Sequence, residues 1–171
     1  MLRTLSILAL AGTALAAAHM TPTVPAPGPG AVIAMHQKLF QAIDAGNAER
    51  ALEFLSADLN MQDEHRGRPC TLFLVDGSGA PVTSVGAEAS RELLASWIAA
   101  SEGRWETKLT SARDDCFSGE LSYAVLEFER KRTDTKKPVV RRYRSTSLVT
   151  YDEGWKITHW HVSPAGEAAA K

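Results

Sequence analysis

GWKITHWHVSP, residues 154–164, is the stretch that decides the fold, and it combines two Trp, two His and a Ser. Side chains on a strand alternate between its two faces with a period of two. A strand here therefore places five residues on one face: Trp155, Ile157, His159, His161 and Ser163. That face is a metal site, a catalytic site or the inner wall of a fold, and the rest of the chain has to decide.

The sequence after Gly103 predicts four successive antiparallel strands. Their ranges are 104–117, 120–132, 139–151 and 155–163, and short polar or Gly-containing turns separate them. A two-residue turn at Ser118-Gly119 would set Lys108 opposite Glu129 and Leu109 opposite Phe128. Both are favourable cross-strand pairs, so this register is the one we expect.

Three helices are expected before these strands. Residues 31–45 repeat apolar side chains at a helical period, Asn47 can cap a second helix, and a third runs over 87–101. The predicted buried side chains are Val32, Met35, Leu39, Phe40 and Ile43 in the first helix, and Leu93, Leu94, Trp97 and Ile98 in the third. Between the second and third helices, the segments 70–75 and 80–85 flank DGSG and predict a short hairpin. This order predicts an α+β fold with helices packed on one face of a curved sheet.

The ends of the chain predict export. Residues 1–18 resemble a cleaved signal peptide, with Arg3 as the basic region and an apolar run shorter than the roughly 20 residues of a membrane span. Residues 19–30 form a Pro/Gly-rich tether, 31–164 a single domain and 165–171 a disordered tail. We therefore expect a periplasmic or secreted protein without a transmembrane segment.

The net charge argues against nucleic acid as a partner, and the two cysteines raise the question of a disulfide. The formal net charge is −1, and it becomes −2 once Arg3 is removed, so no global field steers the protein to nucleic acid. An exported chain with two cysteines, Cys70 and Cys116, is a candidate for a disulfide that stabilises by up to about 4 kcal/mol. The sequence leaves open whether the two sulfurs meet.

The closing strand carries a resemblance to a known family. Its Trp-x-Ile-x-His-x-His-x-Ser pattern and the opening helix pair, MHQKLFQAIDAGNAERALEFLSADL (35–59), resemble the SnoaL-like branch of the nuclear transport factor 2-like superfamily. That branch also includes the association domain of calcium/calmodulin-dependent kinase II. The resemblance implies a cone-shaped α+β barrel, with three helices on a strongly curved mixed sheet and a pocket between them. It also implies homodimers that pair through the sheet.

One departure limits what the resemblance implies. Many relatives have an aromatic-rich strand after the second helix, whereas this chain has the polar MQDEHRGRPCTLFLV (61–75). Some relatives are isomerases, cyclases or dehydratases, and others only bind or scaffold. No catalytic residue is therefore transferred from the enzymes.

The register of the last hairpin decides where the two histidines lie. A three-residue DEG turn sets Tyr151 opposite Trp155, and the pairs that follow gather one polar set on the pocket side: Tyr143, Ser145, Ser147, His159 and His161. A slip of one residue would replace these partners with Leu148 and Thr146. Arg141 lies on the same face of its strand as Tyr143, so it can reach the same pocket and bind an anionic ligand. Trp97 of the third helix can form the bottom of this pocket.

Three readings of the His pair stay open. A zinc site needs three or four ligands, and no spacing ties further ligands to this strand, so no metal is expected. In a catalytic site, His159 or His161 would act as acid or base and Tyr143 as the electrophilic partner. In the third reading the pair lines a polar pocket wall and hydrogen-bonds to Ser and Tyr.

The basic stretch RKRTDTKKPVVRRYR (130–144) suggests another surface. It holds eight basic residues against one acid, Asp134, which is typical of a solvated hairpin but also of an anion-binding surface. An interaction module would use this hairpin, through Arg141, Arg142 and Arg144, or the sheet itself.

These features favour a small-molecule-binding pocket in an exported domain, in a non-catalytic or accessory role. The alternatives are a lyase or isomerase acting on a small hydrophobic substrate, and a dimeric interaction module. No cofactor fingerprint occurs in the sequence, so no cofactor is expected.

Overall fold

The computed structural model describes residues 30–56, 70–76, 80–100, 104–116, 121–136, 139–151 and 154–165. The predicted signal segment, the tether up to residue 29 and the tail from residue 166 lie outside these ranges, as do most of 61–75 and the tips of several turns.

Three helices precede the long strands, as predicted: α1 (Ala31–Asp44), α2 (Ala48–Leu52) and α3 (Ala87–Ala99). Gly46 turns the chain between α1 and α2 with a positive φ of 71°, a conformation that favours glycine. The side-chain oxygen of Asn47 accepts the backbone N–H of Arg50 at 2.9 Å and so caps α2. The predicted apolar face of α1 is buried throughout.

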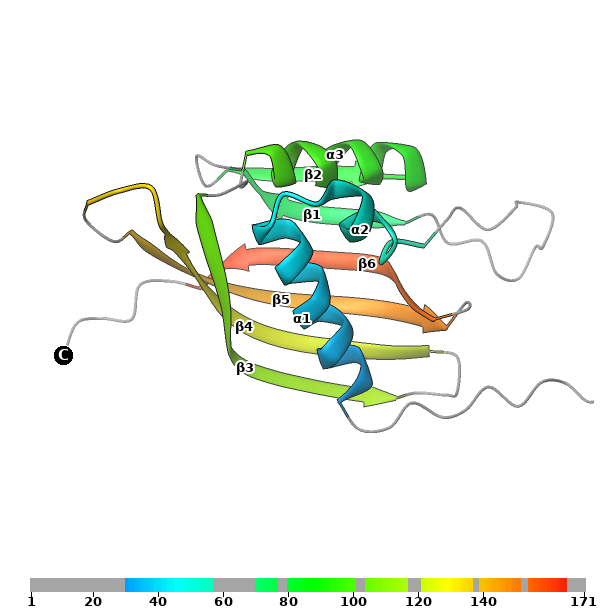
Figure 1. Ribbon diagram of the computed structural model, residues 1–171. Coiled ribbons are helices and arrows are strands. Elements are labelled where there is room, and N and C mark those ends of the chain that lie inside the picture. Colours follow the sequence, from blue (N-terminus) through cyan, green and yellow to red (C-terminus); the bar gives the residue numbers. More distant parts are fainter. Residues whose placement is uncertain are drawn as a thin grey trace, which may run out of the picture.

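Six strands form one mixed sheet, which confirms the predicted α+β class. They are β1 (Thr71–Val75), β2 (Pro81–Val85), β3 (Trp105–Cys116), β4 (Leu121–Arg132), β5 (Val140–Tyr151) and β6 (Trp155–Pro164). The order is β2-β1-β6-β5-β4-β3, in which only β1 and β6 run parallel. The sheet has two edges, β2 and β3, so it is a curved open sheet and not a closed barrel (Figure 1).

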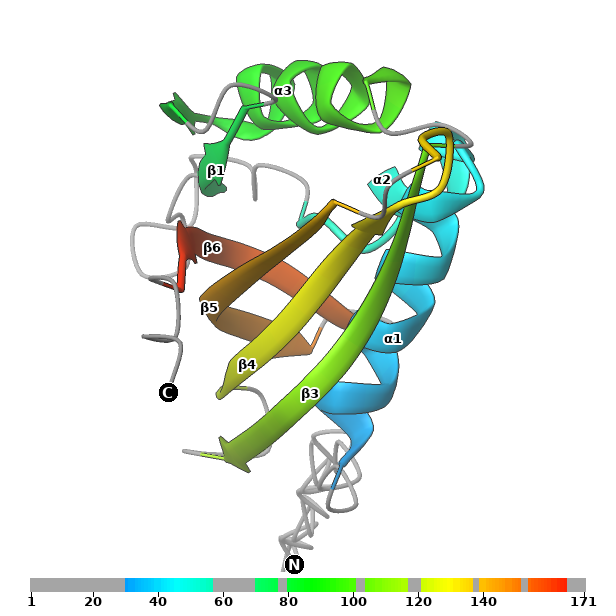
Figure 2. The same ribbon diagram turned by 90° about the vertical axis from the view of Figure 1, so that its left-hand side faces the viewer.

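The helices cover one face of the sheet, here called the inner face, which carries Leu72, Phe128 and Trp160. In Figure 1, α1 crosses this face over the long strands, while α3 lies along β1 and β2. Figure 2 shows how strongly the long strands curve beside α1. The opposite, outer face carries Phe73 and His161. A two-layer arrangement of this kind buries one face of the sheet against the helices.

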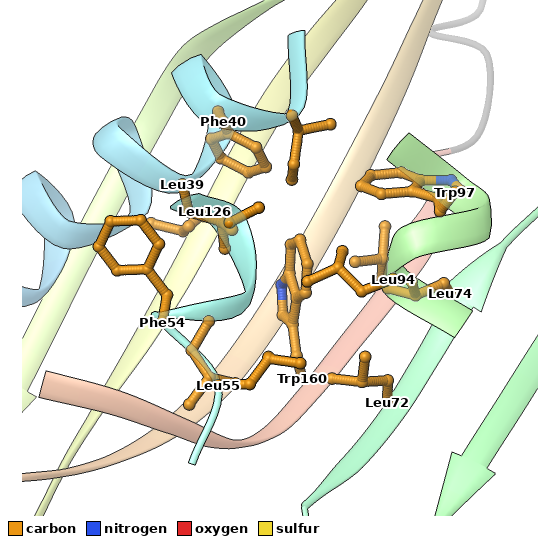
Figure 3. Packing of buried hydrophobic residues seen from close by; sticks show 14 of the residues in the cluster. Leu39, Phe40, Phe54, Leu55, Leu72, Leu74, Leu94, Trp97, Leu126 and Trp160 are labelled. Atoms are coloured by element: carbon orange, nitrogen blue, oxygen red, sulfur yellow. The ribbon is translucent and has the colours of Figure 1, made fainter. Parts of the chain in front are cut away.

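Trp160 is the centre of the hydrophobic core. It is fully buried, and Figure 3 shows its ring between α1, α3 and the strands. Its ring centroid lies 5.9 Å from that of Trp97 and 6.0 Å from that of Phe40, while His36 contacts it edge-on at 6.5 Å. One side chain of β6 thus packs against two helices at once.

The two predicted pairs of β3 and β4 are present, but the register that a two-residue turn would set holds only in the half of the ladder far from the turn. Lys108 pairs with Glu129 and Leu109 with Phe128. A β-bulge between Leu109 and Ser111 interrupts the ladder, and beyond it the pairing toward the turn is offset by one residue.

The predicted register of β5 and β6 holds only at its start. Tyr151 pairs with Trp155 as expected, but the ladder shifts by one residue between Leu148 and Val149. From there Leu148 pairs with His159, Thr146 with His161 and Ser147 with Trp160. The prediction that both histidines share a face with Tyr143, Ser145 and Ser147 is therefore wrong, because the bulge turns them to the outer face.

Thr158 is the extra residue that produces this bulge. It lets Ile157 and Trp160, three positions apart, both point into the core, where both are fully buried. The backbone of Ile157 is fixed by the segment after α2, through Ile157 N–H to the Phe54 carbonyl at 2.7 Å and Ser56 N–H to the Ile157 carbonyl at 3.0 Å. The Thr158 hydroxyl donates to the Leu148 carbonyl at 3.2 Å.

The strand order separates the two cysteines. Cys70 directly precedes β1 and Cys116 ends β3, with β6, β5 and β4 between them. Four strand spacings amount to roughly 19 Å along the sheet, whereas a disulfide needs Cα atoms about 4.4–6.8 Å apart. The Cys70 thiol donates instead to the Ile157 carbonyl at 3.5 Å. The fold therefore does not bring the predicted disulfide pair together.

Replacing Trp160 should be far more costly than replacing an exposed apolar residue. We expect Trp160→Ala to lower the free energy of unfolding by about 3–5 kcal/mol, because it empties the centre of the core. The control Val85→Ala, at a side chain that is 62% exposed, should change it by no more than about 0.5 kcal/mol. Urea denaturation followed by circular dichroism measures both, and a similar loss in the two variants would contradict this packing.

Candidate functional site

Arg130 occupies the inner face of β4 and is only 4% exposed. Strand parity explains its position, because Leu126 and Phe128 precede it on the same face. Its guanidinium carbon lies 4.6 Å from the centroid of the Trp97 ring and 5.4 Å from that of Trp105. One tryptophan comes from α3 and the other from β3, so the cation is held between two aromatic walls.

The carboxylate beside Arg130 does not hydrogen-bond to it. Asp44, the last residue of α1, accepts the Thr107 backbone N–H at 2.5 Å and the Thr107 hydroxyl at 2.8 Å. Its nearest approach to Arg130 is 3.8 Å, from Oδ1 to Nη2, which is an ion pair without a hydrogen bond. Arg130 Nε and Nη2 are both buried and have no acceptor within the part of the chain that the structure describes.

These two donors form the side-on fork with which an arginine grips a carboxylate. The same chain shows this geometry two residues along: Arg132 donates through Nε to Asp134 Oδ1 at 2.5 Å and through Nη2 to Asp134 Oδ2 at 2.9 Å. In Arg130 the equivalent pair of N–H groups has no carboxylate of the described chain within hydrogen-bond distance, since Asp44 comes no closer than 3.8 Å. Most buried polar groups are hydrogen-bonded, so this fork is an exception that needs a cause.

The charges around the fork favour an anion. Burial lowers the pKa of Arg130, which the negative charge of Asp44 and the nearby Tyr143 partly oppose, and the group stays cationic at neutral pH. Burial also raises the pKa of the Asp44 carboxyl, against the opposing effect of its Thr107 hydrogen bonds. Arg141 pairs with Arg130 across the strands and lies over the other side of the site, 5.4 Å from the Trp105 centroid.

Three residues of the predicted pocket therefore meet at Arg130: Arg141, Tyr143 and Trp97. Tyr143 is buried on the inner face and stacks on Phe128 at 5.3 Å. Ser145 and Ser147 lie deeper on the inner face of β5. The Ser145 hydroxyl is a further buried group that has no hydrogen-bond partner in the described chain.

Ser147 belongs to a closed structural contact with His36 of α1. The His36 ring nitrogen Nδ1 lies 2.8 Å from the Val32 carbonyl, which can only accept, so Nδ1 carries the proton. Nε2 then accepts the Ser147 hydroxyl at 2.9 Å. Burial is the main reason that the pKa of His36 falls to about 4. A neutral histidine with both nitrogens bonded supports the core.

His159 and His161 lie on the outer face, on the other side of the sheet from Tyr143 and Arg130. Their rings flank Phe73 of β1, with centroid distances of 5.4 and 6.0 Å. Partial burial lowers the pKa of His159, and the neighbouring His161 lowers it further. The predicted acid/base partnership of either histidine with Tyr143 is ruled out by this separation across the sheet.

The basic stretch at 130–144 is largely neutralised by its own neighbours. On the outer face Arg142 Nε donates to Glu129 at 2.8 Å and Arg144 Nε donates to Glu127 at 2.9 Å. Arg132 is paired with Asp134, and Arg130 is buried. The stretch is thus not a uniform cationic surface.

Sequence reasoning missed Arg130, Trp105, Asp44 and Thr107. A signal for Arg130 is present, because it continues the apolar alternation of Leu126 and Phe128 toward the core. Asp44 gives no comparable signal, since its position at the end of α1 is that of an ordinary surface residue.

Neither a metal site nor a membrane span is found where the structure describes the chain. Its His, Cys, Asp and Glu side chains form no group of three or more that could hold an ion. No helix in the same residues is both long and apolar enough to cross a bilayer.

The fold has many relatives among solved structures. No protein-family model and no curated protein sequence matches the chain. A candidate dehydratase of the NTF2-like family from Streptomyces avermitilis superposes with a TM-score of 0.63 at 14% identity, covering 79% of this chain and 94% of that one. A candidate calcium/calmodulin-dependent protein kinase II association domain from Xanthomonas campestris gives 0.62 at 15%, covering 84% and 93%. The CaMKII hub of S. rosetta gives 0.58 at 19%, covering 82% and 99%.

These similarities establish the nuclear transport factor 2-like fold that the closing strand and the helix pair predict. At this level of identity they show the fold alone, and the fold hosts enzymes as well as assembly domains. What this chain does has to be inferred from its own residues.

His36 predicts a loss of stability in acid. Its folded-state pKa of about 4 lies below the 6.5 of an unfolded histidine, so the unfolded chain binds the proton first as the pH falls. Neutral His36 makes its full contribution to the free energy of unfolding above about pH 6.5. Between about pH 6.5 and about pH 4 this contribution, about 3 kcal/mol, is lost.

The check is urea denaturation at several pH values for the unmodified protein and for His36→Gln. The variant will be less stable at pH 8, but the gap should narrow by about 3 kcal/mol on reaching pH 4. Curves that stay parallel across this range would show that His36 is not held neutral.

Proposed function

We propose that the protein binds a small planar carboxylate at Arg130, without catalysing its conversion. The observation that carries this proposal is the Nε and Nη2 fork, which is buried yet has no acceptor among the described residues. An ordered carboxylate would supply two charge-assisted hydrogen bonds to it. Similarity to ligand-processing members of the fold, such as the candidate dehydratase, is compatible with a small-molecule role.

The surroundings define the class of ligand. Trp97, Trp105 and Tyr143 supply flat aromatic surface, so a ring on the ligand would pack well beside the fork. Arg141 adds a second positive charge, whereas Asp44, the carboxylate that ion-pairs with Arg130, has both oxygens hydrogen-bonded to Thr107. A monoanionic aromatic acid fits these features better than a neutral or cationic molecule.

Binding without turnover agrees with the groups present. Acid/base catalysis needs a titrating side chain within hydrogen-bond reach of the ligand. The two histidines that the sequence suggested as acid or base, His159 and His161, face away from Arg130. His36, a further histidine that the structure places on the inner side of the sheet, is neutral with both nitrogens hydrogen-bonded.

Benzoate titrated into the protein by isothermal calorimetry tests the proposal. We expect saturable binding, and at least a tenfold weaker affinity in Arg130→Lys, because lysine keeps the charge but loses the fork. The matched control Arg142→Lys alters an exposed, paired arginine of the neighbouring strand and should leave the affinity unchanged. Equal benzoate affinity in all three proteins, or none in any, would refute a carboxylate site at Arg130.

A second candidate function is assembly through the outer face of the sheet. We propose that a second copy covers this face, because β4 exposes Leu121 (37%) and Val125 (40%) there, and the Phe73–His159–His161 rings lie farther along it. Association domains among the structural neighbours, such as the candidate domain from Xanthomonas campestris and the CaMKII hub of S. rosetta, support this role at the level of the fold.

Val125→Glu tests assembly, since a carboxylate buried in an apolar interface is costly. Light scattering should show a dimer for the unmodified protein and a monomer for Val125→Glu. The control Val139→Glu changes a valine of the same 40% exposure that precedes β5, and should remain dimeric. A monomer before any substitution would exclude this interface.

A further inference from the structure

A cavity opens near the start of α1, at the other end of this helix from Arg130. It has a volume of ≈ 310 Å³ and lies between the first two turns of α1, the end of α2 and the start of β6. Its lining residues are Ala31, Ala34, Met35, Lys38, Arg50, Glu53, Phe54, Gly154, Trp155 and Lys156. None of these residues belongs to the Arg130 site, and the sequence patterns assigned no role to this region.

The floor and one wall of this cleft are apolar. Met35 and Phe54 are buried in the core at 7% and 9% exposure, while Trp155 is partly buried against it. Ala31 and Ala34 bring only methyl groups to the helix side, and Gly154 brings none. Small residues beside large flat ones leave room for a ligand's apolar body, and the volume is at the lower end of the range for ligand sites.

The rim of the cleft is cationic. Three basic side chains, Lys38, Arg50 and Lys156, face one carboxylate, Glu53, and that carboxylate is already ion-paired with Arg50. Lys156 Nζ donates to the Glu53 backbone carbonyl at 2.7 Å, which places its ammonium group at the rim without an ion-pair partner among the described residues. In a protein with a net charge of −1, this local excess of positive charge is distinctive.

We propose that this cleft binds a small amphipathic carboxylate, such as a medium-chain fatty acid. The apolar chain would lie on Met35, Phe54 and Trp155, and the carboxylate would meet the ammonium groups of Lys38 and Lys156. Inorganic anions and sugar phosphates lack an apolar body to cover this floor, and neutral lipids lack the charge. The site is independent of Arg130 and stands whether or not the inner pocket binds benzoate.

Calorimetric titration with octanoate tests the inference. We expect one site per chain and at least a tenfold weaker affinity in the Lys38→Gln/Lys156→Gln double variant. Ala34→Trp, at an exposed helix position, should fill the cleft and abolish binding. The control Lys136→Gln removes an exposed lysine elsewhere and should bind like the unmodified protein.

Two further arms separate this site from its alternatives. Arg130→Lys should leave octanoate binding unchanged, and 1-octanol should bind more weakly than octanoate because it lacks the charge. Loss of octanoate binding in Arg130→Lys would place the ligand in the inner pocket and overturn the inference. The inference would also be overturned if neither Ala34→Trp nor Lys38→Gln/Lys156→Gln weakened octanoate binding. The same holds if octanoate did not bind at concentrations up to about 10 mM, which corresponds to a binding free energy weaker than about 3 kcal/mol. Circular dichroism of each variant confirms that it is folded.

Discussion

The bulge at Thr158 is the constraint on which the arrangement of this protein depends. One extra residue in β6 turns Trp160 into the core, where its ring meets Trp97 and Phe40, and sends His159 and His161 to the outer face. Without the bulge, the strand that carries Ile157 inward would carry the histidines inward as well, and Trp160 would face solvent. Burying an aromatic side chain is worth several kcal/mol more than burying an imidazole, which accounts for the direction of the shift.

The sequence predicted the elements with a regular apolar pattern and failed where a bulge interrupts the pattern. The helices and the β3–β4 pairs far from the turn were predictable because apolar periodicity and opposite-charge pairs, such as Lys108 with Glu129, agree with each other. The bulge after Leu109, which shifts the rest of that ladder, left no local signal. The β6 register was not predictable, because period-two counting assumes an unbroken strand. If Trp160 and Val162 had been given more weight than the His-x-His spacing, the residues of β6 that face the core would have been predicted correctly. The anchoring of Ile157 by the segment after α2 is a long-range contact that no local pattern contains.

The surroundings of Arg130 were only partly predictable. Its neighbours Arg141, Tyr143 and Trp97 follow from strand and helix parity, whereas the burial of the charge depends on Asp44 and two tryptophans from distant elements. Burying a guanidinium without full hydrogen bonding costs several kcal/mol, and an apolar residue of similar size would usually be as stable or more so. The carboxylate site proposed for Arg130 would offset this cost.

The helix α1 connects the two sites physically. Its buried stripe, from Val32 to Ile43, packs against the sheet along the length of the helix. Asp44 at its last residue orders Thr107 beside Arg130, and Ala34 and Lys38 near its start border the second cleft. The residues around Arg130 and those lining this cleft do not overlap, and the length of α1 separates them. The two sites should therefore bind independently, and their free energies of binding should add.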